Sequence, residues 1–452
     1  MLATLEGCTV GPNYRRPAVP VPPAFRDSQG TTTAGTQDQS FADLPWWQVF
    51  HDPVLQNLIR TALKNNYDLL TATERINQAR AQLGITRSNQ FPQIQGSGDF
   101  SGGKSSSQQT SNILTLAADA SYQLDLFGGL RRATEASRAQ LLGTQEARRV
   151  VVLTLVSDIA SDYFQLLGLD LQLQIDRDTI TAQRDSVRLT QLRVDRGVAT
   201  KVDVLQAQQV LDTANAQIPD IERQIGQDED AISILLGNYP EGVPRGQKLT
   251  EQYAPPQVPA GLTSALLERR PDIHEAEQTL VAANAEIGVA KAAFFPQISL
   301  TGSGGGSLGH LTFAGVGASA NSGLWSYGAS LAQPLFTGGQ LISNLHLVKS
   351  EERQALIGYK QTIQKAFGEV SDALIGYQKI HEQRIRQEAS VATLQEAVRI
   401  SDMRYRGGIT AFLEVLDNQR SLFSAQVALA QIRTSEYQSL VTLYKVLGGG
   451  WK

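Results

Sequence analysis

The sequence predicts an α+β protein made of two copies of one unit, each joining a short hairpin of strands to a long hairpin of helices. Three observations support this fold class. The chain repeats itself at a nearly constant offset, a stretch of the first copy alternates apolar and polar residues, and each copy holds a helical run of about 66 residues.

The internal repeat is visible in motifs that recur at a fixed distance. Phe91-Pro92-Gln93-Ile94 recurs as Phe295-Pro296-Gln297-Ile298, at an offset of 295 − 91 = 204 residues. Later in each copy, Gly197-Val198 recurs as Gly408-Ile409, at an offset of 408 − 197 = 211. A repeat of roughly 200 residues is too long for a solenoid and indicates a pseudo-symmetric shape built by duplication.

Each copy opens with a helix that a Phe-Pro pair ends, because proline disfavours helix in the residue before it. Two strands follow, joined by a Ser/Gly-rich loop, and the stretch from Leu114 to Leu126 alternates as a strand with two different faces would. Gly302–Gly306 is interpreted as a flexible strand–loop junction, and Leu308–Gly317 as an apolar loop. The predicted ranges are about 68–89 and 272–293 for the helices, and about 91–100, 113–126, 295–304 and 324–335 for the strands.

A very long helix comes next in each copy, up to about Val194 or Arg404, and at 1.5 Å per residue it would be a rod of about 100 Å. Glycine then reverses the chain, since glycine tolerates left-handed dihedral angles. Return helices are predicted at about 200–236 and 411–447. The first rod carries a heptad-like apolar seam that predicts packing on a neighbouring helix: Leu153, Val156, Ala160, Tyr163 and Leu167.

Composition argues against several functions. Lys plus Arg is 40 against 44 for Asp plus Glu, so the net charge is −4 and no nucleic-acid partner is expected. Cysteine occurs once, as Cys8, which excludes a disulfide framework and a cysteine zinc cluster. Neither His274-Glu275 nor His381-Glu382 continues to His-Glu-x-x-His. These motifs do not support metal catalysis, so we expect no metal site.

The strands admit two interpretations. Four per chain are too few for a membrane barrel, which needs about eight, so a barrel would require assembly. The alternation fits such a barrel, with lipid outside and water inside, and fits a soluble sandwich as well. Aromatic residues at strand ends, among them Phe127, Trp325 and Tyr327, favour the interfacial belts of a barrel, with core packing as the alternative. No run of about 18 apolar residues suggests a spanning helix.

Motifs along nearly the whole chain resemble the outer-membrane factor family of tripartite efflux pumps, which includes TolC-like and OprM-like outer-membrane efflux lipoproteins. The N-terminal stretch from Gly7 to Tyr14 is similar to the mature start of these lipoproteins. The other motifs that carry the resemblance, in chain order, are Pro45–Phe50, Phe91–Gln93, Leu126–Gly129, Phe295–Gln297, Gln333–Phe336 and Glu414–Phe423.

The resemblance implies a homotrimer, whose twelve strands, four from each chain, form a β-barrel in the Gram-negative outer membrane, continuous with a long periplasmic α-helical barrel. It implies a passive exit duct for drugs or other small toxic compounds. The resemblance also implies no catalytic residue and no cofactor, so the protein is not expected to be an enzyme. The partners would be a periplasmic adaptor (membrane fusion) protein and an inner-membrane transporter of the proton-driven resistance-nodulation-division type. A heavy-metal efflux duct is the alternative within the family, and a periplasmic coiled-coil scaffold without a pore is the alternative from a different class.

The expected domain organisation follows the repeat. An N-terminal lipoprotein tail and equatorial segment precedes the first copy, an equatorial linker separates the copies, and a short end follows the second. The predicted ranges are 1–60, 61–237 (first copy), 238–260, 261–448 (second copy) and 449–452.

Lipidation is predicted at Cys8. Leu5–Cys8 approximates a lipobox, in which the cysteine becomes the lipid-modified first residue of the mature protein. Glu6 stands where the family has a small residue, and Met1–Gly7 lacks the basic segment and apolar core of a signal peptide. A free thiol in a flexible tail is the alternative.

A gate is predicted at the periplasmic tip. By resemblance, Leu413, Glu414 and Asp417 constrict the channel, and Tyr405 belongs to the network that locks it. In a trimer each carboxylate would form a ring, where like charges repel and attract cations. Thr410 stands where a TolC-like channel has the arginine of the lock, so the closed-state mechanism of such a channel cannot be carried over. The candidate substitutes are Arg404, Arg406, Asp195 and Arg196.

The two tip turns are predicted at Gly197 and Gly408, where an adaptor would dock; a C-cap role is the simpler interpretation of both glycines. Asp203 belongs to the same tip. With Thr200 it forms Thr-x-x-Asp, so helix capping is its competing explanation.

Overall fold

The computed structural model describes residues 9–22, 43–104, 110–252, 265–313 and 316–450. Cys8 lies outside them. The chain forms two compact units, each with segments from both repeats: unit 1 comprises 1–19, 74–146 and 274–362, and unit 2 comprises 20–73, 147–273 and 363–452.

The helices are α1 (Trp46–Val49), α2 (Pro53–Asn65), α3 (Tyr67–Ser88), α4 (Gly129–Asp195), α5 (Lys201–Leu235), α6 (Leu266–Arg269), α7 (Pro271–Ala292), α8 (Gln340–Arg406) and α9 (Phe412–Val446). The strands are β1 (Gln93–Lys104), β2 (Thr110–Leu124), β3 (Gln297–Phe313) and β4 (Val316–Ala332).

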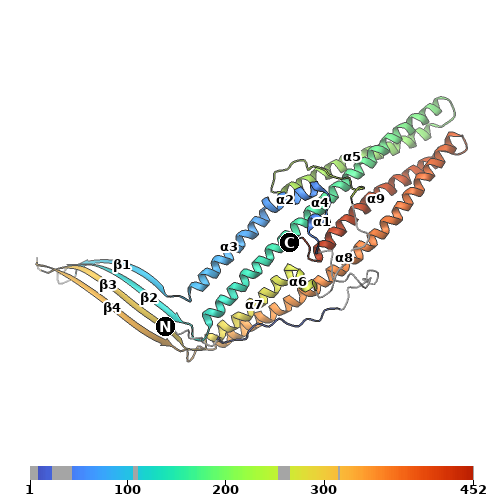
Figure 1. Ribbon diagram of the computed structural model, residues 1–452. Helices are drawn as coiled ribbons and strands as arrows, with labels where there is room; N and C mark the ends of the chain where they lie inside the picture. The colour runs from blue at the N-terminus through green and yellow to red at the C-terminus, as the bar shows by residue number, and fades with distance from the viewer. Residues whose placement is uncertain (1–8, 23–42, 105–109, 253–264, 314–315, 451–452) are drawn as a thin grey trace. The chain divides into compact units, whose positions relative to one another are not determined.

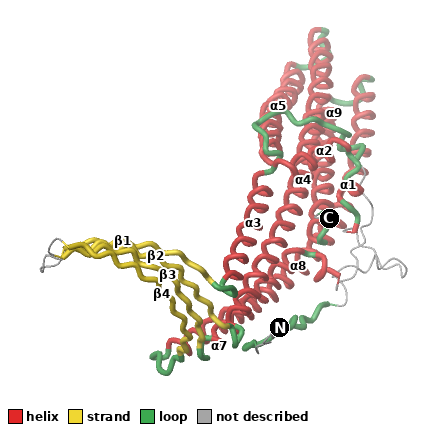
Figure 2. Tube along the Cα trace, turned by 60° about the vertical axis from the view of Figure 1, so that its left-hand side comes forward, coloured by secondary structure: helices red, strands yellow, loops and turns green. Residues whose placement is uncertain are grey.

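Unit 1 is organised by one antiparallel sheet of four strands in the order β1-β2-β3-β4 (Figures 1 and 2). The hairpin of the first repeat joins that of the second through β2 and β3, with Ala118 opposite Gly304. Both repeats therefore contribute to a single sheet, and β1 and β4 are its edges.

The strands of the second repeat are longer than the sequence predicts. β3 runs to Phe313 and β4 begins at Val316, so the loop expected at Leu308–Gly317 is mostly strand. The prediction of a flexible junction at Gly302–Gly306 is also wrong, because these residues pair with β2 on one side and with β4 on the other. Hydrogen bonds from two neighbouring strands hold the backbone there. At Gly305 glycine is required, since a Cβ would lie 2.4 Å from the carbonyl oxygen of Leu116.

The N-terminal segment 9–16 is fastened to unit 1. The amide of Val10 donates to the carbonyl of Phe127 at 3.0 Å, at the point where β2 has ended and α4 is about to begin. Further along, the buried guanidinium of Arg132 donates to the side-chain oxygen of Asn13 at 2.6 Å. Residues that follow Cys8 in the chain therefore lie against the base of the sheet.

Unit 2 is helical, and its core follows the predicted seam. Leu153, Val156, Ala160, Tyr163 and Leu167 are all buried. α4 and α8 each have 67 residues, and α5 and α9 each have 35, so the two repeats match in length. α4 also contains an 18-residue window of mean hydropathy 1.5, and 56% of that window is buried inside the chain, as in the core helix of a helical protein.

A buried carboxylate ties the connecting segments of unit 2 together. Asp52 caps α2 by accepting a hydrogen bond from the amide of Val54 at 2.8 Å. Its second oxygen accepts bonds from the Tyr163 hydroxyl, the Gln247 amide and the Gln252 side chain. Burial opposes ionisation, yet these hydrogen bonds hold the pKa of Asp52 below its usual value.

Candidate functional site

The sheet of unit 1 has two chemically different faces, because successive residues of a strand point to opposite sides. One face, here called the aromatic face, carries only apolar side chains and glycine in its central part. Trp325 and Tyr327 stand on it 77% and 82% exposed, with their rings stacked at 5.9 Å. The register places on this face Ile94, Gly96, Gly98, Phe100, Leu114, Leu116, Ala118, Ala120, Tyr122, Leu124, Ile298, Leu300, Gly302, Gly304, Gly306, Leu308, Gly323, Trp325, Tyr327, Ala329 and Leu331.

The opposite face, here called the serine face, is polar. Hydroxyl groups meet across β3 and β4, with Ser303 and Ser326 at 2.7 Å and Ser307 and Ser322 at 2.8 Å. Its other members include Gln93, Gln95, Ser97, Asp99, Ser101, Ile113, Thr115, Ala117, Asp119, Ser121, Gln123, Gln297, Ser299, Thr301, Gly305, Gly309, Leu324, Gly328, Ser330 and Ala332, of which Ile113 and Leu324 are the large apolar residues. A sheet of this kind separates an apolar environment from an aqueous one.

The tip turns of unit 2 have matching backbones. Gly197 and Gly408 both have φ +74°, in the left-handed region that glycine adopts without strain. After each glycine, the next amide donates back to the helix, from Val198 to Arg193 and from Ile409 to Arg404, at 2.9 Å in both turns. This is the Schellman pattern that ends a helix, so both glycines are C-caps of the long helices.

The return helices begin differently in the two repeats. Asp203 forms a full capping box with Thr200 at the start of α5: the Thr200 amide donates to its carboxylate at 2.8 Å, and the Asp203 amide donates to the Thr200 hydroxyl at 3.3 Å. Glu414 stands at the equivalent position of α9, since 414 − 203 = 211. It pairs with Arg404 at 2.8 Å and accepts a hydrogen bond from the Thr410 hydroxyl.

Tyr405 is held inside the tip. It is 6% exposed and packs on Phe412 at 5.2 Å between ring centroids, in a cluster with Ala207, Val415 and Leu416. Burial raises the pKa of the Tyr405 hydroxyl. Sequence reasoning missed Arg193, whose guanidinium lies 4.3 Å from the centre of the Tyr405 ring. The internal repeat could have identified Arg193, because it is the counterpart of the candidate lock residue Arg404 at the offset of 404 − 193 = 211.

The remaining predicted gate residues lie on one side of α9. Leu413 is 58% exposed, and Asp417, one turn further, is exposed as well. Asp417 forms no ion pair with the part of the chain that the structure describes. Of the candidate lock residues, Arg404 pairs with Glu414, whereas Arg406 pairs with Asp402 in its own helix at 2.8 Å.

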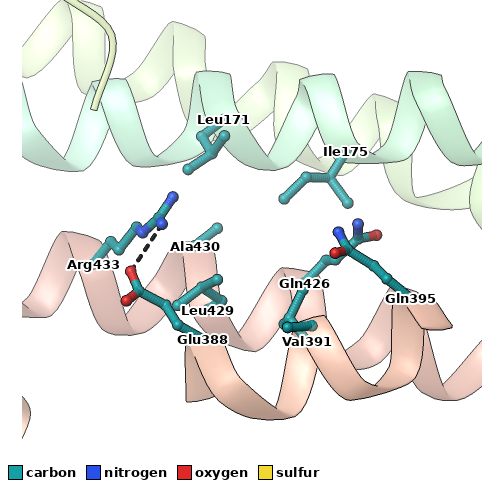
Figure 3. A pocket seen from close by; sticks show the side chains of 10 residues that line it. Leu171, Ile175, Glu388, Val391, Gln395, Gln426, Leu429, Ala430 and Arg433 are labelled. Atoms are coloured by element: carbon teal, nitrogen blue, oxygen red, sulfur yellow. Dashed lines mark hydrogen bonds and ion pairs between the residues drawn. The ribbon is translucent and has the colours of Figure 1, made fainter. Parts of the chain in front are cut away.

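A groove of about 530 Å³ opens between α4 and the hairpin of α8 and α9 (Figure 3). Leu171 and Ile175 point into it from α4, and opposite them Arg433 donates to Glu388 at 2.9 Å. Its other lining residues are Val391, Ala392, Gln395, Gln426, Leu429 and Ala430. Apart from this ion pair and the amides of Gln395 and Gln426, the lining is aliphatic. Within the described residues, no three His, Cys, Asp or Glu side chains are grouped to hold a metal ion.

Comparison with known proteins agrees with this architecture. The chain matches the outer membrane efflux protein family over residues 58–238 and 262–449. It is 36% identical to the cation efflux system protein CusC of Escherichia coli K12 over 450 residues, which cover 99% of this chain and 97% of CusC. It is 38% identical over 465 residues to the toluene efflux pump outer membrane protein TtgC of Pseudomonas putida, covering 99% and 93%. The probable outer membrane lipoprotein SilC of Salmonella typhimurium is 33% identical over 451 residues, covering 99% and 96%.

Solved structures give the same result. Crystal structures of CusC superpose with a TM-score of 0.86 at 34% identity, covering 98% of this chain and all of theirs. The open state of the MtrE outer membrane channel of Neisseria gonorrhoeae has a TM-score of 0.87 at 32% identity, covering 98% of this chain and 99% of MtrE.

The chain belongs to the outer membrane efflux protein family. It is an outer-membrane channel protein of an efflux system, and not an enzyme. The fold class predicted from the sequence, with a four-stranded sheet and two long helical hairpins per chain, is confirmed.

Proposed function

We propose that the chain is one of three identical subunits of an outer-membrane exit duct, which passively releases small organic compounds delivered by an inner-membrane pump and a periplasmic adaptor. The two-faced sheet carries this proposal. β1 and β4 each pair with only one strand among those described, and four strands are too few to close a barrel. Three copies would provide twelve strands, with the aromatic face toward lipid and the serine face toward water.

The adaptor is proposed to dock at the two tip turns. The first turn exposes Val198 and Val202, and the second exposes Ile409 at the position equivalent to Val198. They are 58% to 73% exposed, and exposed apolar groups gathered at one end of a helical hairpin are typical of a protein interface. The pump is proposed to be of the resistance-nodulation-division type, by family resemblance.

The gate is proposed to combine exposed side chains, which would face the lumen, with side chains that contacts within each chain hold in place. Leu413 and Asp417 are exposed on α9 and would form rings in a trimer, where the Asp417 carboxylates attract cations. Glu414 and Tyr405 would be the side chains held in place, since Arg404 and Arg193 contact them within the tip of each chain.

Lipidation of Cys8 remains a proposal. The segment after it lies against the base of the sheet, as the bond between Val10 and Phe127 indicates, and this is where a barrel would meet the periplasmic leaflet. Intact-mass measurement of protein purified from membranes tests it. A mass increase corresponding to acyl chains, lost in Cys8→Ser, is expected; an unmodified thiol contradicts it.

The cargo is proposed to be organic, although relatives named for cation efflux and for toluene efflux are almost equally similar. Expression in a strain that lacks its own outer-membrane factor separates the two classes. Restored resistance to solvents or dyes, without restored resistance to copper or silver, is expected. Restored metal resistance alone would favour the heavy-metal duct.

The pore itself is tested with purified protein in planar bilayers. Currents through the trimer are expected to be small and to grow in a variant carrying both Asp417→Ala and Glu414→Ala. Large currents that the substitutions leave unchanged would refute the gate and keep the duct. A protein that stays monodisperse without detergent and gives no currents would instead be the scaffold.

A further inference from the structure

The charges of the sheet are distributed very unevenly. Asp99 and Asp119 are the only charged side chains in the central parts of the four strands, which are residues 93–103, 112–124, 297–309 and 322–332. Both are carboxylates, and the register places both on the serine face. Asp119 lies opposite Gln95 on β1 and Ser303 on β3, and Asp99 lies opposite Thr115. Neither forms an ion pair within these strands, in contrast to Glu414 at the tip.

One large apolar side chain interrupts the serine face between these carboxylates. Leu324 is 74% exposed and lies opposite Gly305, in the row of cross-strand neighbours that continues through Ala117 to Ser97. The row of cross-strand neighbours that contains Asp119 lies two residues along the strands from the Leu324 row. The row that contains Asp99 lies two residues from it in the opposite direction, and each separation is about 7 Å. Leu324 therefore projects from a floor of small residues, between two rows that each carry a negative charge.

We propose that Asp99, Asp119 and Leu324 form a selectivity segment in the strand part of the duct, which favours organic cations with an apolar body. The carboxylates attract positive charge and repel anions, and the exposed leucine offers apolar contact that a hydrated inorganic ion cannot use. In a trimer each of the three residues would occur three times around the lumen. The inference rests on the proposed function, because the serine face borders water only if the sheets of three chains close into a barrel.

The test measures reversal potentials and block of the trimer in planar bilayers. With a potassium chloride gradient, the ratio of potassium to chloride permeability is expected to fall about 5-fold in the Asp99→Asn/Asp119→Asn variant, since two carboxylates per chain then no longer act across the lumen. Gln95→Ala, a neutral change beside Asp119, is the matched control and should leave the ratio unchanged. Gln95→Glu adds a carboxylate to the same row and should raise it.

The leucine is tested with tetrabutylammonium, a cation with an apolar body. The concentration that halves the potassium current is expected to rise about 5-fold in Leu324→Ser, while the potassium to chloride ratio stays at the parent value. Each variant is first checked as a trimer by size-exclusion chromatography in detergent.

The outcomes are distinct. An unchanged permeability ratio in both the Asp99→Asn/Asp119→Asn and the Gln95→Glu variants overturns the role of the carboxylates. Unchanged block in Leu324→Ser overturns the role of the leucine. A parent protein that is trimeric yet never conducts overturns the proposed duct, and not the selectivity segment alone.

Discussion

Asp176 offers the sharpest test of the energetics of the long helices. It lies on α4, fully buried, and neither of its carboxylate oxygens has a hydrogen-bond partner in the described part of the chain. One turn further, Ile180 packs with Leu211 and Ala214 of α5 in an apolar cluster. Burial of the charged form is expensive in such surroundings and raises the pKa of Asp176 to about 6.

The direction of the pKa shift of Asp176 determines how the stability of the folded state changes with pH. The folded state holds the proton of Asp176 more tightly than the unfolded state, whose pKa is about 3.9. Stability is therefore unaffected below both pKa values, falls as the pH rises between them, and stays reduced above the folded pKa. A pKa raised to about 6 in the folded state corresponds to a loss of about 3 kcal/mol of unfolding free energy at pH 8.

Asp176→Asn keeps the shape and removes the charge, so it should recover much of that free energy. We expect the apparent melting temperature of the protein in detergent, followed by circular dichroism, to rise by about 3 °C at pH 8. The rise should shrink toward zero at pH 4.5. Asp178→Asn is the control, since Asp178 is exposed on the same helix and accepts a hydrogen bond from Gln174 at 2.8 Å. A gain that is equal at the two pH values, or a loss at pH 8, would refute the reasoning.

Further substitutions test packing and hydrogen bonding by the same melting assay. Gly168→Ala should destabilise the protein by about 2 kcal/mol, because its Cβ would lie 2.0 Å from the Thr434 hydroxyl. Gly226→Ala has open space and should stabilise by about 1 kcal/mol; equal effects of the two would contradict the packing. Asp52→Asn should cost about 3 kcal/mol at pH 7 and much less at pH 3, since a lowered pKa means that the contribution of the carboxylate disappears as the pH falls; a loss independent of pH would contradict this. Thr200→Ala should remove the capping box and cost about 1 kcal/mol, and an unchanged melting temperature would show that the cap is unimportant.

Helix boundaries were predictable because strong local signals mark them. The Phe-Pro pairs and the turn glycines placed the ends of α3, α4 and α8 within two residues. Strand boundaries in the second repeat were not, because glycine and serine are common in loops and only pairing on both sides makes them strand. Gly302–Gly306 is the example, since its conformation depends on β2, which lies almost two hundred residues away in the chain.

The candidate site was predictable in position and not in its contacts. The repeat brings the two tip turns into correspondence, and the capping box at Asp203 can be read from four residues. The pairing of Glu414 with Arg404, and the burial of Tyr405 beneath Arg193, depend on how four helices meet. Likewise, nothing local distinguishes the buried Asp176 from the exposed Asp178.

The equal lengths of corresponding helices limit how this chain can change during evolution. α4 and α8 have 67 residues each, and α5 and α9 have 35 each. Deletion of one residue from a single helix would turn everything beyond it by about 100° and remove its seam from the neighbouring helix. A longer or shorter descendant would therefore require matched changes of about seven residues in all four helices. The length of the helical part should therefore change only when all four helices change together. An engineered variant of different length would need matched insertions or deletions in both repeats.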